Sequence, residues 1–193
     1  MIEYLKKHIL LSKNAEEALR EAIEVKTYLP NEHLFWANDN CCDYFFIQQG
    51  LARVYVQDIK GKDQTLWLVG EERITSPMQS VFRKRERKIS FSCELLTASE
   101  VVQLKHKDLI RLVNQFPEFL EMFMLVVCQF SDDVMNHIAE TKKPCRERIL
   151  NFIKTNKAIF GLLPFKHLAS YLGMTSEAFS RVKGKMLREH NVI

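Results

Sequence analysis

The sequence predicts an α+β protein, in which a barrel of short strands is followed by one long helix and a small helical domain. Three observations lead to this prediction. Short apolar or alternating segments recur between Val25 and about Leu104, and turn signals separate them. An apolar stripe at helical spacing then runs through Glu118–Thr141. Finally, Phe165–Val182 has the pattern of two short helices joined by a tight turn at Gly173.

The N-terminal segment, residues 3–29, carries a helical pattern, because apolar side chains recur there at three- and four-residue steps. It lacks the long apolar core of a secretory signal. Nowhere does an apolar run reach the roughly 18 residues of a membrane span. We therefore expect a cytoplasmic protein with no membrane segment. The side chains of the helical pattern are Leu10, Leu11, Ala15, Ala18, Leu19, Ala22 and Ile23.

The region up to about Leu104 is typical of a sandwich or small barrel of short strands. Two hairpins are predicted within it. One is Phe45–Val56, with Gly50 in the middle, and the other is Arg53–Leu68, around Lys60-Gly61. The predicted strand segments are Tyr28–Leu29, Leu34–Trp36, Tyr44–Gln48, Ala52–Gln57, Thr65–Val69, Ile89–Ser92 and Val101–Leu104.

The long helix Glu118–Thr141 is apolar nearly all round in its N-terminal half, so we expect it to be buried on more than one side. One side would cover the barrel. On the other side we expect a twin helix from a second subunit. The alternative is that this helix packs between two domains of one chain. Lys142-Lys143-Pro144 ends the pattern, and a further helix is predicted at Cys145–Lys154. The candidate dimer-interface residues are Leu120, Phe123, Val127, Phe130 and Val134.

The pattern in Phe165–Val182 is that of a helix-turn-helix. The first helix runs from about Pro164 to Leu172, because proline suits a first helical turn. Gly173 then reverses the chain, and Thr175 or Ser176 caps a second helix that continues through Arg188. A helical hairpin that serves stability alone is the alternative. The inward-facing positions are Leu168, Ala169, Leu172, Met174, Phe179 and Val182.

Charge is concentrated at the same end of the chain. From Thr141 to Ile193 there are 11 Lys and Arg against 3 Asp and Glu, whereas the rest of the chain carries a net charge of −4. Such clustering is typical of a surface that contacts nucleic-acid phosphates, although a solvated basic face would look the same. Ser176, Glu177 and Arg181 would contact bases. The residues better placed for phosphates are Thr175, Ser180, Lys183 and Lys185.

This order of elements resembles the bacterial regulators that include the cyclic-AMP receptor protein and the oxygen sensor FNR. Tyr44–Glu72 resembles that family's barrel strands around a glycine turn, and Thr97–Val102 resembles the strand that closes the barrel. Arg146–Phe152 and Leu163–Leu187 resemble its DNA-binding domain. The resemblance implies a homodimeric transcription regulator that binds an inverted repeat in double-stranded DNA and works with RNA polymerase.

The resemblance also implies a domain organisation. Residues 1–116 would form a cyclic nucleotide-binding-like sensor barrel, with the topology of a double-stranded β-helix or jelly roll. Residues 117–141 would form the dimerisation helix, and residues 142–193 the helix-turn-helix domain. An effector would bind between barrel and long helix and change the relative orientation of the two DNA-binding domains.

The effector pocket departs from the nucleotide-binding pattern. Gly70-Glu71-Glu72 resembles the first part of the family's phosphate cassette, but the position of its arginine falls on Ile89, which Ser90 follows. We therefore expect cyclic AMP not to be the effector, and the effector is unknown. The candidate pocket residues are Glu72, Arg87 and Ser90. No cofactor is predicted, and an iron–sulfur cluster of the FNR type is not expected, because no cysteine precedes Cys41.

Catalysis and metal binding are not predicted. The six histidines are scattered without a paired metal spacing or a nucleophile motif, so we predict no catalytic residues and no enzyme. The five cysteines show no CxxC pair or zinc spacing and are expected to be reduced thiols. The alternative function is a ligand-binding barrel that acts through protein partners without specific DNA binding.

Overall fold

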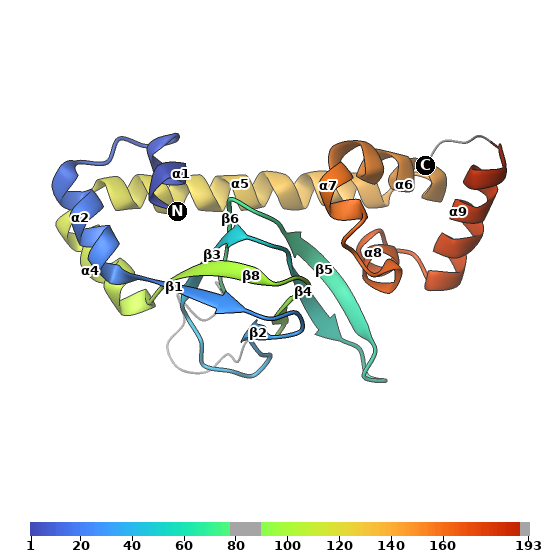
Figure 1. The fold of residues 1–193 in the computed structure, drawn as a ribbon, viewed down its shortest axis with the longest axis horizontal. Helices are drawn as coiled ribbons and strands as arrows, with labels where there is room; N and C mark the ends of the chain where they lie inside the picture. The colour runs from blue at the N-terminus through green and yellow to red at the C-terminus, as the bar shows by residue number, and fades with distance from the viewer. Residues whose placement is uncertain (78–89, 190–193) are drawn as a thin grey trace.

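The computed structural model describes residues 1–77 and 90–189 (Figure 1). Its strands are β1 Ile23–Tyr28, β2 His33–Phe35, β3 Tyr44–Gln49, β4 Ala52–Gln57, β5 Asp63–Val69, β6 Arg73–Thr75, β7 Ser92–Leu95 and β8 Ser99–Leu104. Its helices are α1 Ile2–Lys6, α2 Lys13–Ala22, α4 His106–Gln115, α5 Glu118–Thr141, α6 Cys145–Thr155, α7 Lys157–Phe160, α8 Phe165–Tyr171 and α9 Ser176–Glu189.

The strands form two four-stranded antiparallel sheets, which together make a jelly-roll-like barrel. Their orders are β1-β8-β3-β6 and β2-β7-β4-β5. Helix α5 runs along the long axis of the molecule, with α1, α2 and α4 at one end and α6 to α9 at the other (Figure 1). The α+β fold with a barrel of short strands, predicted from the sequence, is therefore confirmed. None of the helices within the described ranges is both long enough and apolar enough to cross a lipid bilayer.

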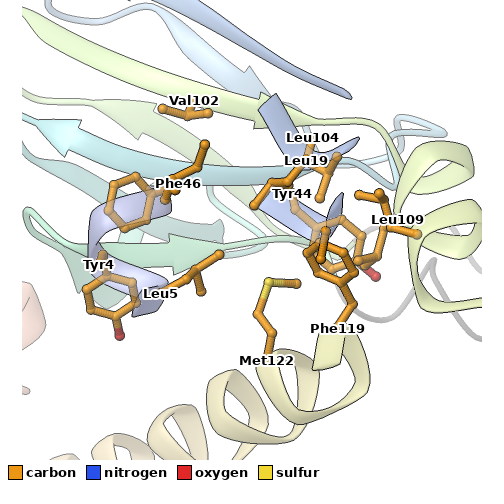
Figure 2. Packing of buried hydrophobic residues seen from close by; sticks show 13 residues of the cluster. Tyr4, Leu5, Leu19, Tyr44, Phe46, Val102, Leu104, Leu109, Phe119 and Met122 are labelled. Carbon is orange, nitrogen blue, oxygen red and sulfur yellow. The ribbon is translucent and has the colours of Figure 1, made fainter. Parts of the chain in front are cut away.

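Alternation along β3 and β8 separates two apolar clusters, because successive side chains of a strand point to opposite faces. Phe45 and Ile47 of β3 face the second sheet and fill the space between the sheets. Tyr44 and Phe46 face the other way, toward the helices. Figure 2 shows this second cluster, in which Phe119 and Met122 of α5 meet side chains of β3, β8, α2 and α4. The start of α5 is thereby fixed to the barrel.

The predicted continuous helical pattern over residues 3–29 is wrong. Ser12 interrupts it, because its hydroxyl accepts from the backbone N–H of Ala15 and caps α2. Leu10, counted among the apolar positions of the pattern, is 91% exposed in the connection. From Ile23 the chain is a strand that pairs with β8 along its whole length. Its alternating β-branched Ile23, Val25 and Thr27 favour that conformation.

Of the two predicted hairpins, one is confirmed and one is wrong. β4 and β5 pair around Lys60-Gly61, with Gln57 opposite Asp63. β3 and β4 instead belong to different sheets, so Gly50 carries the chain from one sheet to the other. Gly50 has φ +110°, and a Cβ there would lie 2.2 Å from Ser99 Oγ. Only glycine fits both the backbone angle and this close approach.

The remaining sequence predictions mostly agree with the structure. α5 has the predicted bounds, and the predicted helices of the C-terminal region are found as α6, α8 and α9. β7 lies three residues later than predicted, and Ile89, its predicted first residue, lies outside the described residues. The sequence analysis missed β6, α4 and α7. All five cysteines are free thiols.

Candidate nucleic-acid interface

Helices α8 and α9 are joined by a tight turn at Gly173. The backbone N–H of Met174 donates to the carbonyl of Ala169 at 2.9 Å, and Gly173 has φ +65°. Thr175 caps the next helix, because its hydroxyl accepts from the backbone N–H of Ala178 at 3.1 Å. The predicted glycine reversal is therefore confirmed, and Thr175 is identified as the cap.

The inner faces of α8 and α9 pack against α6. Leu168 and Ala169 are fully buried, and Phe179 is 1% exposed. Ile149 and Phe152 of α6 complete the same cluster. The start of α9 is therefore supported by a cluster of buried side chains from all three helices.

Arg148 of α6 stabilises the turn, and the sequence analysis did not identify it. Its Nη1 donates to the carbonyl oxygens of Leu172 and Gly173, the second at 3.3 Å. Its Nη2 donates to Cys145 Sγ at 3.1 Å. The guanidinium thus satisfies carbonyls that the end of α8 leaves without helical partners. No local pattern around Arg148 indicates this, since its partners lie 24 and 25 residues away.

The candidate DNA-binding side chains lie together at the start of α9 and on its exposed side. Ser176, Glu177, Ser180 and Arg181 are all exposed. So are Thr175 and Lys185. The backbone N–H of Glu177 and the hydroxyl of Thr175 donate to the Glu177 carboxylate and lower its pKa. Glu177 is therefore ionised at neutral pH and can accept hydrogen bonds.

Lys183 differs from the other candidates. It is half-buried, and its Nζ lies 3.7 Å from the centroid of the Phe165 ring in α8. A second ring, that of Phe160, lies 5.9 Å away. The ammonium group therefore takes part in a cation–π contact that ties α9 to α8, in addition to any contact with a phosphate.

The outer face of the second sheet binds α8 through polar groups. Thr65 of β5 donates its backbone N–H to Ser170 Oγ at 2.8 Å. Beside this contact, Arg53 is only 3% exposed and pairs with two carboxylates. Its Nε lies 2.7 Å from Glu94, and its Nη2 lies 2.6 Å from Asp63. Buried charges of this kind persist only when they are paired, and here one arginine is paired with two carboxylates beside α8.

His167 of α8 adjoins the Arg53 cluster and is 7% exposed. Burial, followed by repulsion from Arg53 and Lys166, lowers its pKa to about 4. Asp63 and Glu94 act in the opposite direction but do not prevail. The imidazole is therefore neutral at physiological pH, and its protonation works against the contact between barrel and α8.

A cavity of about 750 Å³ lies where the barrel, the second half of α5 and helix α6 meet. Trp67 of β5 contacts His137 of α5 edge-on, with ring centroids 5.5 Å apart. His137 in turn stacks on Tyr171 of α8 at 4.3 Å. Aromatic rings from the barrel, α5 and α8 thus meet at one wall of the cavity. The size lies within the range of small-molecule sites.

The three effector-pocket candidates stand differently. Glu72 is exposed, with φ +56°, and pairs with Lys7 at 2.8 Å, which lowers the pKa of its carboxyl group. Ser90 is exposed and lies just before β7, whereas Glu72 lies just before β6. β6 and β7 belong to different sheets. Arg87 lies outside the described residues. A pocket formed by the three stays a prediction.

The two sides of α5 have different partners. On the inner side, Gln129 accepts from the Tyr4 hydroxyl at 2.9 Å, and Asp133 pairs with Arg73 at 3.3 Å. Among the candidate interface residues, Leu120 is 54% exposed, whereas Phe123, Val127 and Val134 are half-buried. Phe130 is 47% exposed, and its ring packs edge-on against Trp67, so it lies at the border of the two sides.

A row of side chains, apolar except for one serine, follows the outer side of α5 at alternating steps of four and three residues. The spacing is that of a coiled-coil seam. Compared with the candidate interface residues, the row contains the exposed Met124 and Ile138, lacks Phe123, and leaves Phe130 at its edge. It consists of Leu120, Met124, Val127, Ser131, Val134 and Ile138.

Residues 25–116 match the cyclic nucleotide-binding domain family. No curated protein is significantly similar to the chain in sequence. Solved structures match it over most of its length. A protein of Eubacterium rectale described as a CRP/FNR-family transcriptional regulator has a TM-score of 0.75 at 14% identity, over 93% of this chain and 85% of that one.

Two further structures are similar. The c-di-GMP-responsive global regulator CLP of Xanthomonas campestris has a TM-score of 0.71 at 14% identity, over 92% of this chain and 93% of that one. FixK2 of Bradyrhizobium japonicum has a TM-score of 0.71 at 13% identity, over 86% and 85%. Residues 25–116 thus have the sequence pattern of a cyclic nucleotide-binding domain, and the chain shares its fold with regulators of the CRP/FNR type.

Proposed function

We propose that the protein is a homodimeric transcription regulator that reads DNA with α9 and senses an effector with its barrel. The observation that carries the proposal is the pair α8 and α9, whose tight turn leaves the polar start of α9 exposed. In a helix-turn-helix, the start of the second helix enters the major groove. The fold shared with CRP/FNR-type regulators supports the same function.

Chemistry at the start of α9 supports specific reading of bases. Arg181 lies one turn after Glu177 on the exposed side of the helix. An arginine can donate two hydrogen bonds to guanine, and a carboxylate accepts from the cytosine amino group. Ser176 completes the set of base contacts, while Thr175, Ser180 and Lys185 would bind phosphates. Lys183 would do so from its position over Phe165.

The outer row of α5 supports a two-fold dimer. Leu120, Met124 and Ile138 leave about half of their surface in water in the single chain. Exposed apolar rows at coiled-coil spacing are stabilised by a second helix. A parallel pair of α5 helices would place two copies of α9 on one face of the duplex, about one helical turn apart. The operator would then be an inverted repeat, and RNA polymerase would be a further partner.

The effector is proposed to act through the barrel and α5. The match of residues 25–116 to cyclic nucleotide-binding domains supports a small-molecule ligand. Because Ile89 stands at the position of the family's phosphate-binding arginine, we propose a ligand other than cyclic AMP. Residues 1–116, 117–141 and 142–193 would be the sensor, dimerisation and DNA-binding parts, in a protein of the cytoplasm without catalytic activity.

The test is selection of binding sequences from a random pool of duplex DNA, followed by binding titrations at several salt concentrations. We expect an inverted repeat, bound with an affinity that falls steeply as salt rises. Native mass spectrometry of the protein from its own host would report the subunit count and any retained ligand. Failure to enrich any sequence, with a folded dimer in hand, would favour a barrel module that acts through protein partners.

A further inference from the structure

The β4–β5 hairpin ends in a turn whose shape is fixed by Asp58. The Asp58 carboxylate accepts from the backbone N–H groups of Lys60 at 2.8 Å and Lys62 at 3.0 Å. These two hydrogen bonds lower the pKa of Asp58, so its side chain is ionised at neutral pH. Gly61 has φ +74° and donates its N–H to the Asp58 carbonyl at 2.9 Å. Lys60 and Lys62, both exposed, therefore extend from a defined backbone.

The hairpin is held against α8 at its base. Arg53 of β4 pairs with Asp63, the first residue of β5, and Thr65 donates to Ser170 of α8. From there the hairpin projects beyond the barrel on the side of α8 and α9 (Figure 1). The Arg53–Asp63 pair thus joins the two strands of the hairpin, and the Thr65–Ser170 hydrogen bond ties the hairpin to α8.

The tip also adjoins the start of α9 electrostatically. The positive charge of Lys62 contributes to the lowered pKa of Glu177 in the first turn of α9, after the stronger hydrogen bonds from its own N–H and Thr175. Lys166, at the start of α8, is exposed as well. The hairpin tip, which is distant from α9 in the sequence, therefore brings positive charge near the start of α9 that is proposed to meet DNA.

We propose that Lys60 and Lys62 at the hairpin tip bind backbone phosphates of the DNA next to the groove that α9 enters. The proposal rests on the proposed DNA-binding function and adds the barrel to the DNA-binding surface. A helix in the major groove has a phosphate backbone on each side. A tip beside the first turn of α9 meets that backbone, and lysine is suited to it as a mobile point charge.

The experiment compares two double variants with equal changes of charge. Lys60→Gln with Lys62→Gln removes the hairpin charges. Lys105→Gln with Lys107→Gln removes two exposed charges at α4, at the other end of the molecule (Figure 1). Each is titrated with the selected DNA site and with unrelated duplex DNA between 50 and 200 mM salt. Thermal unfolding confirms that both variants fold, as expected for exposed lysines.

Loss of the hairpin contacts should weaken binding to both DNAs and reduce the salt dependence. Each lost phosphate contact lowers the slope of log K against log salt by about 0.9, so a dimer that loses all four contacts changes its slope by roughly 3 to 4. The α4 variant should keep the wild-type slope. Both variants should select the wild-type sequence, because phosphate contacts carry no base identity.

Three outcomes would overturn the inference. An unchanged slope in the Lys60/Lys62 variant, with wild type binding its site, refutes the hairpin contacts and leaves the function of α9 intact. A changed base preference means that the lysines read bases instead. A third outcome combines two results. If the lysine changes leave DNA binding unaffected, and Ile59→Ala abolishes transcription activation, then the tip contacts a protein partner, because Ile59 is fully exposed there. Wild type that binds no DNA at all refutes the proposed function itself.

Discussion

The backbone N–H of Thr65 in β5 donates a 2.8 Å hydrogen bond to the hydroxyl of Ser170 in α8. The two residues are 105 positions apart, and Thr65 is 5% exposed. Because β5 lies at the edge of its sheet, its outward backbone groups have no further strand to pair with. Ser170 supplies one of the missing partners and so connects the barrel to the helix before the turn.

Replacing Ser170 with alanine should leave the Thr65 N–H buried without its partner. We expect Ser170→Ala to lower the free energy of unfolding by about 1–3 kcal/mol. Urea denaturation measures this difference. The matched control is Ser180→Ala on exposed α9, which should change stability by less than about 0.5 kcal/mol. Equal effects of the two substitutions would mean that water replaces Ser170 at no cost.

His167 should make the protein less stable at acidic pH. Its pKa is about 4 in the folded state, below the ordinary value of 6.5, so the unfolded chain binds the proton more tightly. Protonation of His167 should therefore lower the free energy of unfolding as the pH falls from 6.5 to 4, by about 3 kcal/mol in total. Above pH 6.5 it should have no effect, because the imidazole is neutral in both states. His167→Gln should lose stability less steeply over that window. His8→Gln, at an exposed histidine, is the control and should follow wild type.

A charge on the outer row of α5 should dissociate the proposed dimer without unfolding the chain. Met124 is 53% exposed, so a single subunit tolerates Met124→Asp, whereas a paired helix would bury the carboxylate at a cost of several kcal/mol. Val127→Asp should act in the same way. Analytical ultracentrifugation should show folded monomers, and Gln115→Asp on exposed α4 should stay dimeric. A Met124→Asp protein that sediments as a dimer excludes this row as the interface.

Arg181→Ala should weaken specific DNA binding by about 1–3 kcal/mol and relax the preference at one base position in each half-site. Arg188 provides the control, because it lies at the other end of α9, with Nε donating to the Gly184 carbonyl. Arg188→Ala should leave the selected sequence unchanged. If wild type and Arg181→Ala select the same motif with equal affinity, then Arg181 does not read bases.

Cyclic AMP at millimolar concentration should leave the melting temperature unchanged. A ligand that binds only the folded state must stabilise it by RT ln(1 + [L]/Kd). Ile89 stands where the family's phosphate-binding arginine would be, so the phosphate of cyclic AMP would lack this partner. Differential scanning fluorimetry with cyclic AMP and, as a control, with AMP tests this. A rise of several degrees at micromolar cyclic AMP alone would contradict our interpretation of the pocket.

Sequence patterns predicted best the elements whose signals are local. The bounds of α5 follow from its own apolar spacing, and the turn at Gly173 follows from a glycine between two amphipathic segments. The Lys60-Gly61 hairpin is equally local, since its turn is held by Asp58. The exposed positions at the start of α9 follow from the same helical periodicity.

Elements that depend on distant partners were missed or misassigned. Gly50 looked like a hairpin turn, but its role is set by Ser99, which lies almost fifty residues later. The helical pattern over residues 3–29 extends over β1, because the pairing of β1 with β8 is not visible in its own sequence. Arg148 was missed for the same reason: it binds carbonyls that come near it only after α8 and α9 have folded.

The hydrogen bond between Thr65 and Ser170 has a consequence for how the molecule could change shape. A purely apolar contact between the barrel and α8 would let α8 shift over the barrel by small steps at little cost in free energy. The hydrogen bond from the Thr65 N–H to Ser170 is directional, and a partial shift of α8 would leave this N–H buried and unpaired. Intermediate orientations are therefore unfavourable. We therefore expect any rearrangement of this junction to be a discrete step, between a position in which Ser170 accepts from the Thr65 N–H and one in which water does.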